Sequence, residues 1–331
     1  MQYHAFLNLN ELPYAPCDRV VRAAQQACAR ANRYPEPDAG TLRAALAERW
    51  GVTPDWVVAS GGSAAVIQQM MIASGQSEIA FGWPSFDAFP AVATGLRMAV
   101  RKVELRGDGA CDLKKLRRAI TQKTSMVIVC TPNTPTGGIV HHDELADFLK
   151  QVPSRVLVLI DEAYGEFVRD DHAVRSLELV RAYPNAVLSR TFSKAHGMAG
   201  FRVGYAIAQP ELAGKIRQAG IPFSVPLPAQ AAALAALANE QESTARIDTV
   251  LAERSRLAAT LRELGAEVVA GHGNFVWLPV GELAQHVAGV LGSHGVAVKA
   301  LMPYGVRITV GTEDETDHVI NTWKALDPLA L

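Results

Sequence analysis

The sequence is poor in cysteine and carries almost no excess of charge of either sign. Its four cysteines, Cys17, Cys28, Cys111 and Cys130, form no CxxC pair and no His/Cys cluster with zinc spacing, so we expect free thiols and no metal site. A formal net charge of −1 leaves no basic excess for nucleic acid. Met1–Leu12 lacks the basic and apolar stretches of a signal peptide, and no apolar run reaches membrane length. We therefore expect a cytoplasmic protein that binds small molecules, and no contact with nucleic acid or membrane.

The glycine-rich signatures of nucleotide-binding domains are also missing. No GxGxxG follows the first predicted strand, and no GxxxxGK[ST] occurs in the chain, which disfavours a nicotinamide enzyme and a nucleotide-dependent enzyme. The 331-residue length and the 49% hydrophobic content are nevertheless those of an ordinary globular protein with two packed lobes.

Short apolar segments alternate with amphipathic ones through the first two thirds of the chain. The apolar segments predict buried strands at Glu78–Gly82, Met126–Cys130, Val156–Ile160 and Ala186–Ser189. Between them, helical patterns cover Ala64–Ala73, Asp112–Ile120, His141–Leu149 and Arg175–Ala182. This alternation predicts an α/β domain in which a mostly parallel sheet is sandwiched by helices.

After about Pro228 the pattern becomes that of a smaller α+β domain. We predict helices at Ala229–Asn239, Ser243–Leu264, Leu283–Leu291 and Asp314–Leu326, and strands at Phe275–Pro279, Val296–Lys299 and Arg307–Val310. The predicted organisation is an N-terminal arm that joins the small domain (residues 1–34), a large domain (35–228) and a small domain (229–331).

A lysine stands in an unusual setting after the last predicted strand of the large domain. Thr191-Phe192-Ser193-Lys194 follows that strand directly, and Arg202 lies downstream. A lysine that attacks an aldehyde must be partly desolvated or near other cations, so that its amine is neutral. The two hydroxyls and the arginine suit a phosphate group close by. We interpret Lys194 as a Schiff-base lysine, with a solvated surface lysine as the alternative.

An acidic and aromatic segment, Asp161-Glu162-Ala163-Tyr164, follows the strand at Val156–Ile160. Ligands of α/β proteins bind at this end of their strands. Asp161 could hold a proton on the nitrogen of a pyridine ring, so that the ring accepts electrons from a carbanion. Tyr164 could donate a hydrogen bond to a phenolic oxygen on that ring. Capping of a helix by Asp161 is the alternative.

Two weaker motifs lie earlier in the chain. Gly62 and Ser63 precede the helix Ala64–Ala73, where free N–H groups and the helix dipole favour an anion, although a simple capping loop has the same pattern. Phe86 lies just past the strand Glu78–Gly82 and could either stack on a flat ring or pack in the core.

Arg307 opens an otherwise apolar segment of the small domain. An arginine there could bind a substrate carboxylate through two parallel hydrogen bonds, or form a structural ion pair. Together the motifs bring a lysine, an acid, an aromatic ring and phosphate ligands to the strand ends of one sheet. This combination predicts a site for pyridoxal phosphate.

By these motifs and several longer ones, the sequence resembles the class I and II aminotransferases of fold type I, and most closely the histidinol-phosphate aminotransferase family. The resemblance covers nearly the whole chain and is most specific in RTFSKAHGMAGFRVGYAIA (Arg190–Ala208), DEAYGEF (Asp161–Phe167) and RITVGT (Arg307–Thr312). Other segments look more like the aromatic (phenylalanine) aminotransferase branch of that family: SGGSAAVIQQM, WPSFDAFP, VCTPNTPTG and NFVWLPVG.

The resemblance implies a pyridoxal phosphate enzyme of amino-acid biosynthesis that works as a homodimer. It implies that Lys194 binds the cofactor and shuttles a proton, with Asp161 on the ring nitrogen, Tyr164 on the phenolic oxygen and Phe86 stacked on the ring. The implied phosphate ligands are Gly62, Ser63, Thr191, Ser193, Arg202 and, from the partner subunit, Tyr34. The implied substrate residues are Arg307, Tyr14, Asn10 and Lys299.

Two departures from the family pattern concern this site. Thr134 replaces an asparagine that would donate to the phenolic oxygen, so we expect weaker stabilisation of that oxygen. Lys299 replaces an arginine that is linked to substrate phosphate, which leaves histidinol phosphate and an aromatic amino acid as rival amino donors. Transamination between the donor and a 2-oxo acid is the leading reaction. A decarboxylase resembling threonine-phosphate decarboxylase and a non-catalytic protein that binds pyridoxal phosphate are the alternatives.

Overall fold

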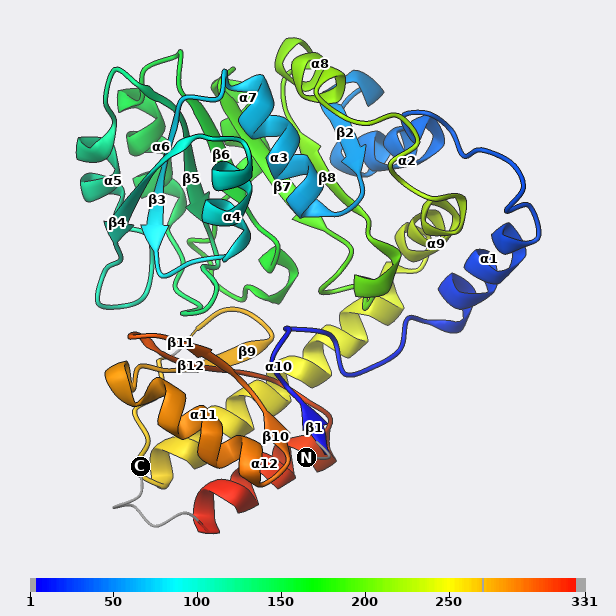
Figure 1. Cartoon of the computed structure of the whole chain (residues 1–331). Coiled ribbons are helices and arrows are strands. Elements are labelled where there is room, and N and C mark those ends of the chain that lie inside the picture. Colours follow the sequence, from blue (N-terminus) through cyan, green and yellow to red (C-terminus); the bar gives the residue numbers. More distant parts are fainter. Residues whose placement is uncertain (1–3, 270, 326–331) are drawn as a thin grey trace.

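The computed structural model describes residues 4–269 and 271–325, which form a large and a small lobe joined by the long helix α10 (Figure 1). The first residues of the predicted arm and the last of the predicted small domain, including Leu326, lie outside the described residues. Within those two stretches, no helix combines the length and the apolar character that crossing a bilayer requires.

A seven-stranded sheet forms the centre of the large lobe. Its order is β2-β8-β7-β6-β5-β3-β4, with the bounds β2 Val57–Ser60, β8 Gly204–Ile207, β7 Ala186–Thr191, β6 Leu157–Asp161, β5 Thr124–Cys130, β3 Glu78–Trp83 and β4 Ala99–Glu104. β8 pairs antiparallel with both of its neighbours, and the remaining pairs are parallel. The predicted fold class is therefore confirmed.

Helices cover both faces of this sheet (Figure 1). One face packs under α2 (Gly40–Trp50), α5 (Leu113–Ala119), α6 (His142–Gln151) and α7 (Ser176–Ala182). The other packs under α3 (Ser63–Ala73), α4 (Ala88–Gly95) and α8 (Pro210–Gln218). Single 3-10 turns complete the chain: η1 (Pro54–Trp56), η2 (Gly165–Phe167), η3 (Ala199–Phe201) and η4 (Gly281–Leu283).

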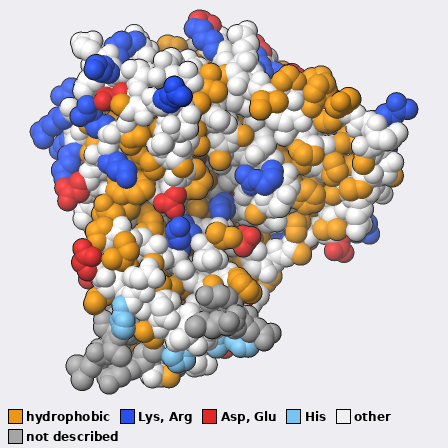
Figure 2. Space-filling view, viewed as in Figure 1, with side chains coloured by type: hydrophobic (Ala, Val, Ile, Leu, Met, Phe, Trp, Pro, Cys, Tyr) orange, Lys and Arg blue, Asp and Glu red, His pale blue; other side chains and the backbone are white. Residues whose placement is uncertain are grey.

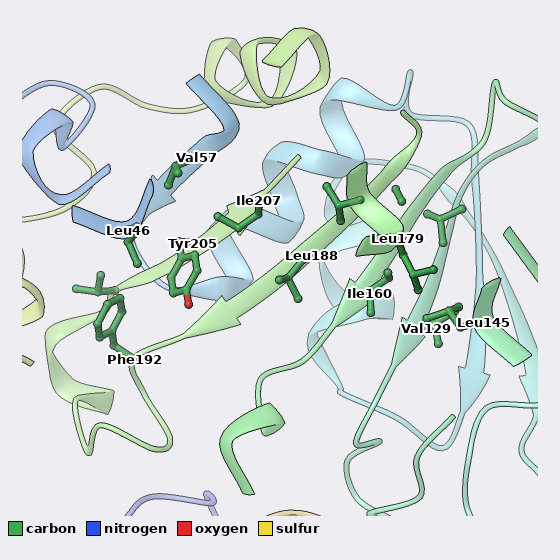
Figure 3. Packing of buried hydrophobic residues seen from close by; sticks show 14 of the residues in the cluster. Leu46, Val57, Val129, Leu145, Ile160, Leu179, Leu188, Phe192, Tyr205 and Ile207 are labelled. Atoms are coloured by element: carbon green, nitrogen blue, oxygen red, sulfur yellow. The ribbon is translucent and has the colours of Figure 1, made fainter. Parts of the chain in front are cut away.

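Burial on both faces explains why the central strands are continuously apolar. Along β6, Val158 and Ile160 belong to one buried cluster, whereas Leu157 and Leu159 belong to the other. Figure 3 shows the first cluster, where Ile160 lies beside residues of the neighbouring strands and helices. Such strands carry no alternation of polar and apolar residues, because neither face meets water.

The sequence missed the strands at the margins of the large sheet. β4 is an edge strand whose side chains are mostly exposed, and its charged residues give no apolar run. The single strand predicted at Val296–Lys299 is wrong. The chain forms β10 (Val296–Ala297) and β11 (Lys299–Leu301) instead, because β10 pairs with the N-terminal β1 while β11 pairs with β12.

The small lobe packs a three-stranded antiparallel sheet against helices. The order is β11-β12-β9, with β12 at Gly305–Thr309 and β9 at Phe275–Leu278. The helices are α10 (Glu240–Glu263), α11 (Ala284–Ser293) and α12 (Glu313–Ala325). Side chains of all three helices form one apolar cluster that also takes in Ala5 and Leu7 of the N-terminal segment, whereas Ile247 and Val250 of α10 belong to the cluster around Tyr164.

The N-terminal segment contacts both lobes. β1 (Ala5–Phe6) pairs parallel with β10 of the small lobe, whereas α1 (Asp18–Cys28) packs against α9 (Leu227–Leu237). The buried side chains of α1 and α9 belong to the cluster of the large sheet. By its packing, α9 therefore belongs to the large lobe, which extends past residue 228. The predicted division into an N-terminal arm, a large domain and a small domain stays a prediction.

Candidate active site

A cavity of about 330 Å³ lies where the carboxyl ends of the parallel strands face the N-terminal segment and the small lobe. The predicted site residues that line it are Ser63, Phe86, Thr134, Asp161, Tyr164, Thr191, Ser193, Lys194, Arg202, Lys299 and Arg307. β6 ends at Asp161 and β7 at Thr191, and these strands are hydrogen-bonded neighbours. The pairing of adjacent strands therefore brings the acid and the lysine loop to one place.

Lys194 is half-buried, and its amine is held by the N-terminal segment. Its Nζ donates to the backbone carbonyls of Leu9 at 3.0 Å and Asn10 at 2.9 Å. Burial lowers the pKa of this amine, and the nearby Arg307 and Arg202 lower it further, against an opposing effect of Tyr164. The surroundings thus favour the neutral, nucleophilic form that attack on an aldehyde requires.

The carboxyl group of Asp161 is buried and incompletely satisfied. It is 2% exposed, and its Oδ1 has no hydrogen-bond partner in the described part of the chain. Burial raises the pKa of Asp161 to about 7, although hydrogen bonding by the backbone of Ala163 opposes the rise. A carboxyl group in this state is suited to a cationic N–H donor inside the cavity, such as a protonated pyridine nitrogen.

A set of donors suited to a phosphate lies at one end of the cavity. Ser63 begins α3, an 11-residue helix whose first N–H groups are free for an anion. The guanidinium of Arg202 donates to Ser193 Oγ at 3.2 Å, and the N–H of Ser193 donates to Thr191 Oγ1 at 3.1 Å. These contacts hold the predicted phosphate ligands of the loop after β7 together.

Two glycines allow this close approach. Gly62 has φ +95°, which favours glycine, and a Cβ there would collide with the guanidinium of Arg202. A Cβ on Gly204 would collide with the backbone of Gly62 and Ser63. Any larger residue would therefore move the predicted phosphate ligands apart.

Tyr164 is fixed from behind by Asn10. The Asn10 amide donates to the Tyr164 hydroxyl at 2.8 Å, and Phe275 packs edge-on to the tyrosine ring at 5.2 Å. Asn10 is fully buried and does not line the cavity. Tyr14 also stays off the cavity wall and packs against the apolar cluster that contains Tyr164.

Arg307 projects from β12 into the cavity and forms no ion pair with any residue in 4–269 or 271–325. It donates to Thr134 Oγ1 at 2.9 Å and to the carbonyl of Asn8 at 2.6 Å, and its Nε is buried without a partner. Burial lowers the pKa of Arg307. The alternative of a structural ion pair is thus wrong, and the guanidinium is available to a carboxylate.

Lys299 and Tyr34 lie at the margins of the site. Lys299 lines the cavity, where its amine forms an ion pair with Asp87 at 3.1 Å. Tyr34 lies outside the cavity, 83% exposed, with its ring 5.0 Å from that of Phe223. Within one chain, the structure therefore does not bring Tyr34 to the other predicted phosphate ligands.

The sequence motifs did not reveal a buried ion network beside Asp161. Arg190 pairs with Glu162 at 2.6 Å and Glu166 at 3.0 Å, and a Cβ on Gly165 would collide with its guanidinium. The three charged residues lie inside the recognised motifs, but their mutual pairing depends on strand packing. The backbone carbonyls of Asn8 and Leu9 were also missed, because a carbonyl contact leaves no signal in residue type.

With this geometry in place, the family can be assigned. The pattern of the family described as "Aminotransferase class I and II" matches residues 6–322. The chain belongs to the class I and II aminotransferases. It is 42% identical over 316 residues to an aromatic amino acid aminotransferase of Thermobifida fusca, covering 95% of this chain and 88% of that protein. A Cutibacterium acnes aromatic amino acid aminotransferase is 40% identical over 316 residues, covering 95% and 90%.

A solved structure has the same fold. The histidinol-phosphate aminotransferase of Sinorhizobium meliloti, in complex with pyridoxal-5'-phosphate, superposes with a TM-score of 0.89 at 23% identity, covering 98% of this chain and 92% of that one. The predicted family, the transaminase activity and the pyridoxal phosphate cofactor are confirmed by the family assignment. The comparisons favour the aminotransferase over the decarboxylase alternative.

The raised pKa of Asp161 makes the stability of the cofactor-free aminotransferase depend on pH. Between the unfolded value of 3.8 and the folded value of about 7, the native state holds a proton that the unfolded state releases. The free energy of unfolding therefore falls as pH rises through this range, by up to about 1.4 kcal/mol per pH unit. Asp161→Asn removes this dependence. The free energy of unfolding of the variant, relative to that of the natural protein, should therefore increase from pH 4 to 7 and stay constant above pH 7. Urea unfolding of both proteins without cofactor measures this difference in the free energy of unfolding. A difference that is constant across the pH range would contradict the raised pKa of Asp161.

Proposed function

We propose that this aminotransferase moves an amino group from an aromatic amino acid to a 2-oxo acid, with Lys194 as the residue that holds pyridoxal phosphate. The observation that carries the proposal is one cavity containing a lysine whose pKa is lowered and a buried carboxyl group with an unpartnered oxygen. The cofactor supplies an aldehyde and a ring that accepts electrons from the substrate. The chain supplies the groups that hold it and move protons.

The cavity residues divide the binding of the cofactor among them. Asp161 would keep a proton on the ring nitrogen, because it lines the cavity and one of its carboxyl oxygens is left without a partner among the described residues. Tyr164 and Thr134 offer hydroxyls toward the phenolic oxygen, and Phe86 would stack on the ring. The phosphate would be held by Gly62, Ser63, Thr191, Ser193 and Arg202. After substrate binds, the Lys194 amine would take the proton from the substrate Cα.

Arg307 would hold the substrate through its α-carboxylate. It is a half-buried arginine on the small-lobe side of the cavity, and its contacts there are two neutral oxygens. A carboxylate would replace or supplement these contacts with charge-assisted hydrogen bonds. Binding at this point places the substrate Cα between Arg307 and Lys194.

The charge near Lys299 favours an uncharged substrate side chain. Asp87 neutralises Lys299 inside the cavity, whereas a phosphate-bearing donor needs a free cation there. The two relatives at about 40% identity are aromatic amino acid aminotransferases, which supports the same choice. Histidinol phosphate becomes the second candidate donor.

We also propose that two copies form a homodimer in which Tyr34 completes the partner's phosphate site. Tyr34, Ile221 and Phe223 form an exposed apolar group, and Figure 2 shows hydrophobic side chains gathered on the same side of the molecule as α9 and the loop before it. Exposed apolar patches of this kind mark protein interfaces.

The covalent attachment can be tested directly. After incubation with pyridoxal phosphate and borohydride reduction, mass spectrometry should find the cofactor fixed on Lys194, and the protein should absorb visible light. Lys194→Ala should show neither signal, whereas Lys299→Ala, the other lysine of the cavity, should retain both. A colourless natural protein, or label on another lysine, would refute the proposal. Phenylalanine, tyrosine and histidinol phosphate added to the loaded protein then rank the donors by loss of the visible band.

Asp87→Asn should shift the preference of the enzyme toward amino donors that carry a phosphate group. The ion pair is partly exposed, with side-chain exposures of 41% for Lys299 and 56% for Asp87, so its loss corresponds to at most about 1 kcal/mol, or roughly fivefold. We expect the ratio of kcat/KM for histidinol phosphate to that for phenylalanine to rise by up to this factor. The double variant with Lys299→Ala should lose the gain. An unchanged ratio would show that the pair does not select the donor.

The dimer is tested by placing a charge on the exposed group. Ile221 is 79% exposed in the single chain, so Ile221→Glu should not disturb its fold but should oppose burial against a second copy. Light scattering after size-exclusion chromatography should show a dimer for the natural protein and a monomer for the variant. Leu283→Glu, an exposed apolar residue of the small lobe, should remain dimeric. A natural protein that is monomeric would refute the proposal.

A further inference from the structure

Asn10 joins the N-terminal segment to both lobes behind the cavity. Its side chain contacts Tyr164 of the large lobe and Thr309 of the small lobe, and its carbonyl accepts from Lys194 and from Asn274. The residue is fully buried, so its hydrogen bonds to Tyr164, Thr309 and Asn274 are shielded from water, whereas the one from Lys194 is partly buried. A residue in this position can act on the site without touching a ligand.

The network fixes the orientation of the Asn10 amide. The backbone N–H of Asn10 donates to Thr309 Oγ1 at 3.0 Å, which leaves the hydroxyl proton of Thr309 free. That proton is donated to Asn10 Oδ1, also at 3.0 Å. With the amide oxygen facing Thr309, the amide N–H₂ must face the hydroxyl of Tyr164 at 2.8 Å.

This orientation decides where the hydroxyl proton of Tyr164 can go. A tyrosine hydroxyl has one proton to donate, and here its oxygen already accepts from Asn10. The hydroxyl donates no hydrogen bond to any residue among 4–269 and 271–325. Tyr164 lines the cavity, so the proton is left for a ligand there. Thr134, the other hydroxyl on this side, accepts from Arg307 and so also keeps its proton.

We propose that Asn10 is a positioning residue that keeps the hydroxyl proton of Tyr164 directed into the cavity, toward the phenolic oxygen of the bound cofactor. The inference rests on the proposed function of Tyr164. By donating to the tyrosine oxygen, Asn10 prevents the hydroxyl from turning away, and it polarises the O–H bond that is left. Asn10 thereby makes the phenolic oxygen easier to keep ionised.

The other charged groups around Tyr164 do not change when Asn10 is replaced. The Lys194 amine lies 5.7 Å from the centre of the tyrosine ring, the charge of Arg307 also reaches Tyr164, and Glu11 lines the same cavity. Phe275 packs on the ring without charge. A neutral substitution at Asn10 therefore isolates the effect of one hydrogen bond.

The test is a pH titration of the visible absorbance of the cofactor-loaded protein without substrate. Asn10→Leu introduces a side chain of similar volume with no hydrogen-bonding group. It should raise the midpoint of the absorbance titration by about one pH unit, because one pH unit corresponds to about the free energy of one hydrogen bond. In a Tyr164→Phe background the same substitution should leave the midpoint unchanged. A loss of packing alone would shift melting temperatures but would not depend on the tyrosine hydroxyl in this way. Equal shifts in both backgrounds, or no shift in either, would overturn the inference.

A matched pair at Thr309 tests the orientation without changing Asn10. Thr309→Ser keeps the hydroxyl that holds the amide oxygen, so its midpoint should stay at that of the natural protein. Thr309→Val frees the amide to rotate, so its midpoint should rise; equal midpoints for the two would overturn the inference. This pair also serves if Asn10→Leu fails to fold. A natural protein with no visible band and no borohydride-fixed cofactor would refute the proposed function itself. An intact band whose titration midpoint is the same in all variants would refute this inference alone.

Discussion

Ionisable groups buried without a counter-charge govern the organisation of this site. Asp161 and Arg307 both lie deep in the cavity, and neither forms an ion pair within the described residues. Beside them, Glu162 and Arg190 are just as buried but neutralise each other. Ionisable groups in the interior are therefore accommodated in two ways: Glu162 and Arg190 offset each other's charge, whereas Asp161 and Arg307 are left for what binds in the cavity. Because Asp161 and Arg307 lack partners of opposite charge among the described residues, a cationic ring nitrogen suits Asp161 and a carboxylate suits Arg307.

The parallel sheet makes this arrangement possible. Because β6 and β7 pair in register, the residues at their ends arrive together without any local contact having to enforce it. The helices on both faces bury the central strands, so the carboxyl end of the sheet is the place left for a ligand. The small lobe and the N-terminal segment then close that edge, and they contribute Arg307, Lys299 and three backbone carbonyls to the region.

Much of this architecture was predictable because its signals are local. The apolar runs of β3, β5, β6 and β7 reveal burial on two faces, and the motif residues stand directly after them in the chain. The edge strand β4 was not predictable in the same way, since an exposed strand needs no apolar run. The break between β10 and β11 depends on a partner strand nearly three hundred residues away, at β1.

Within the site, the sequence predicted which side chains carry the chemistry, but it did not predict which residues those side chains contact. The sequence identified Lys194, Asp161 and Arg307 as residue types that suit the chemistry. It offered Thr134 as a group for the phenolic oxygen, whereas in the structure its hydroxyl contacts Arg307. Asn10 was assigned to the substrate by resemblance, and it lies behind Tyr164 instead. Such contacts depend on how two lobes meet, which no short stretch of sequence records.

The contacts of Asn8 and Leu9 have a consequence for how their importance can be recognised. Both residues reach Arg307 and Lys194 through main-chain oxygens, so almost any amino acid could stand there and preserve the contact. Side-chain scanning, or the degree of variation between species, would therefore rank these two positions as dispensable. Only changes to the path of the backbone, such as a deletion or an ester in place of an amide, would reveal that the cavity depends on them.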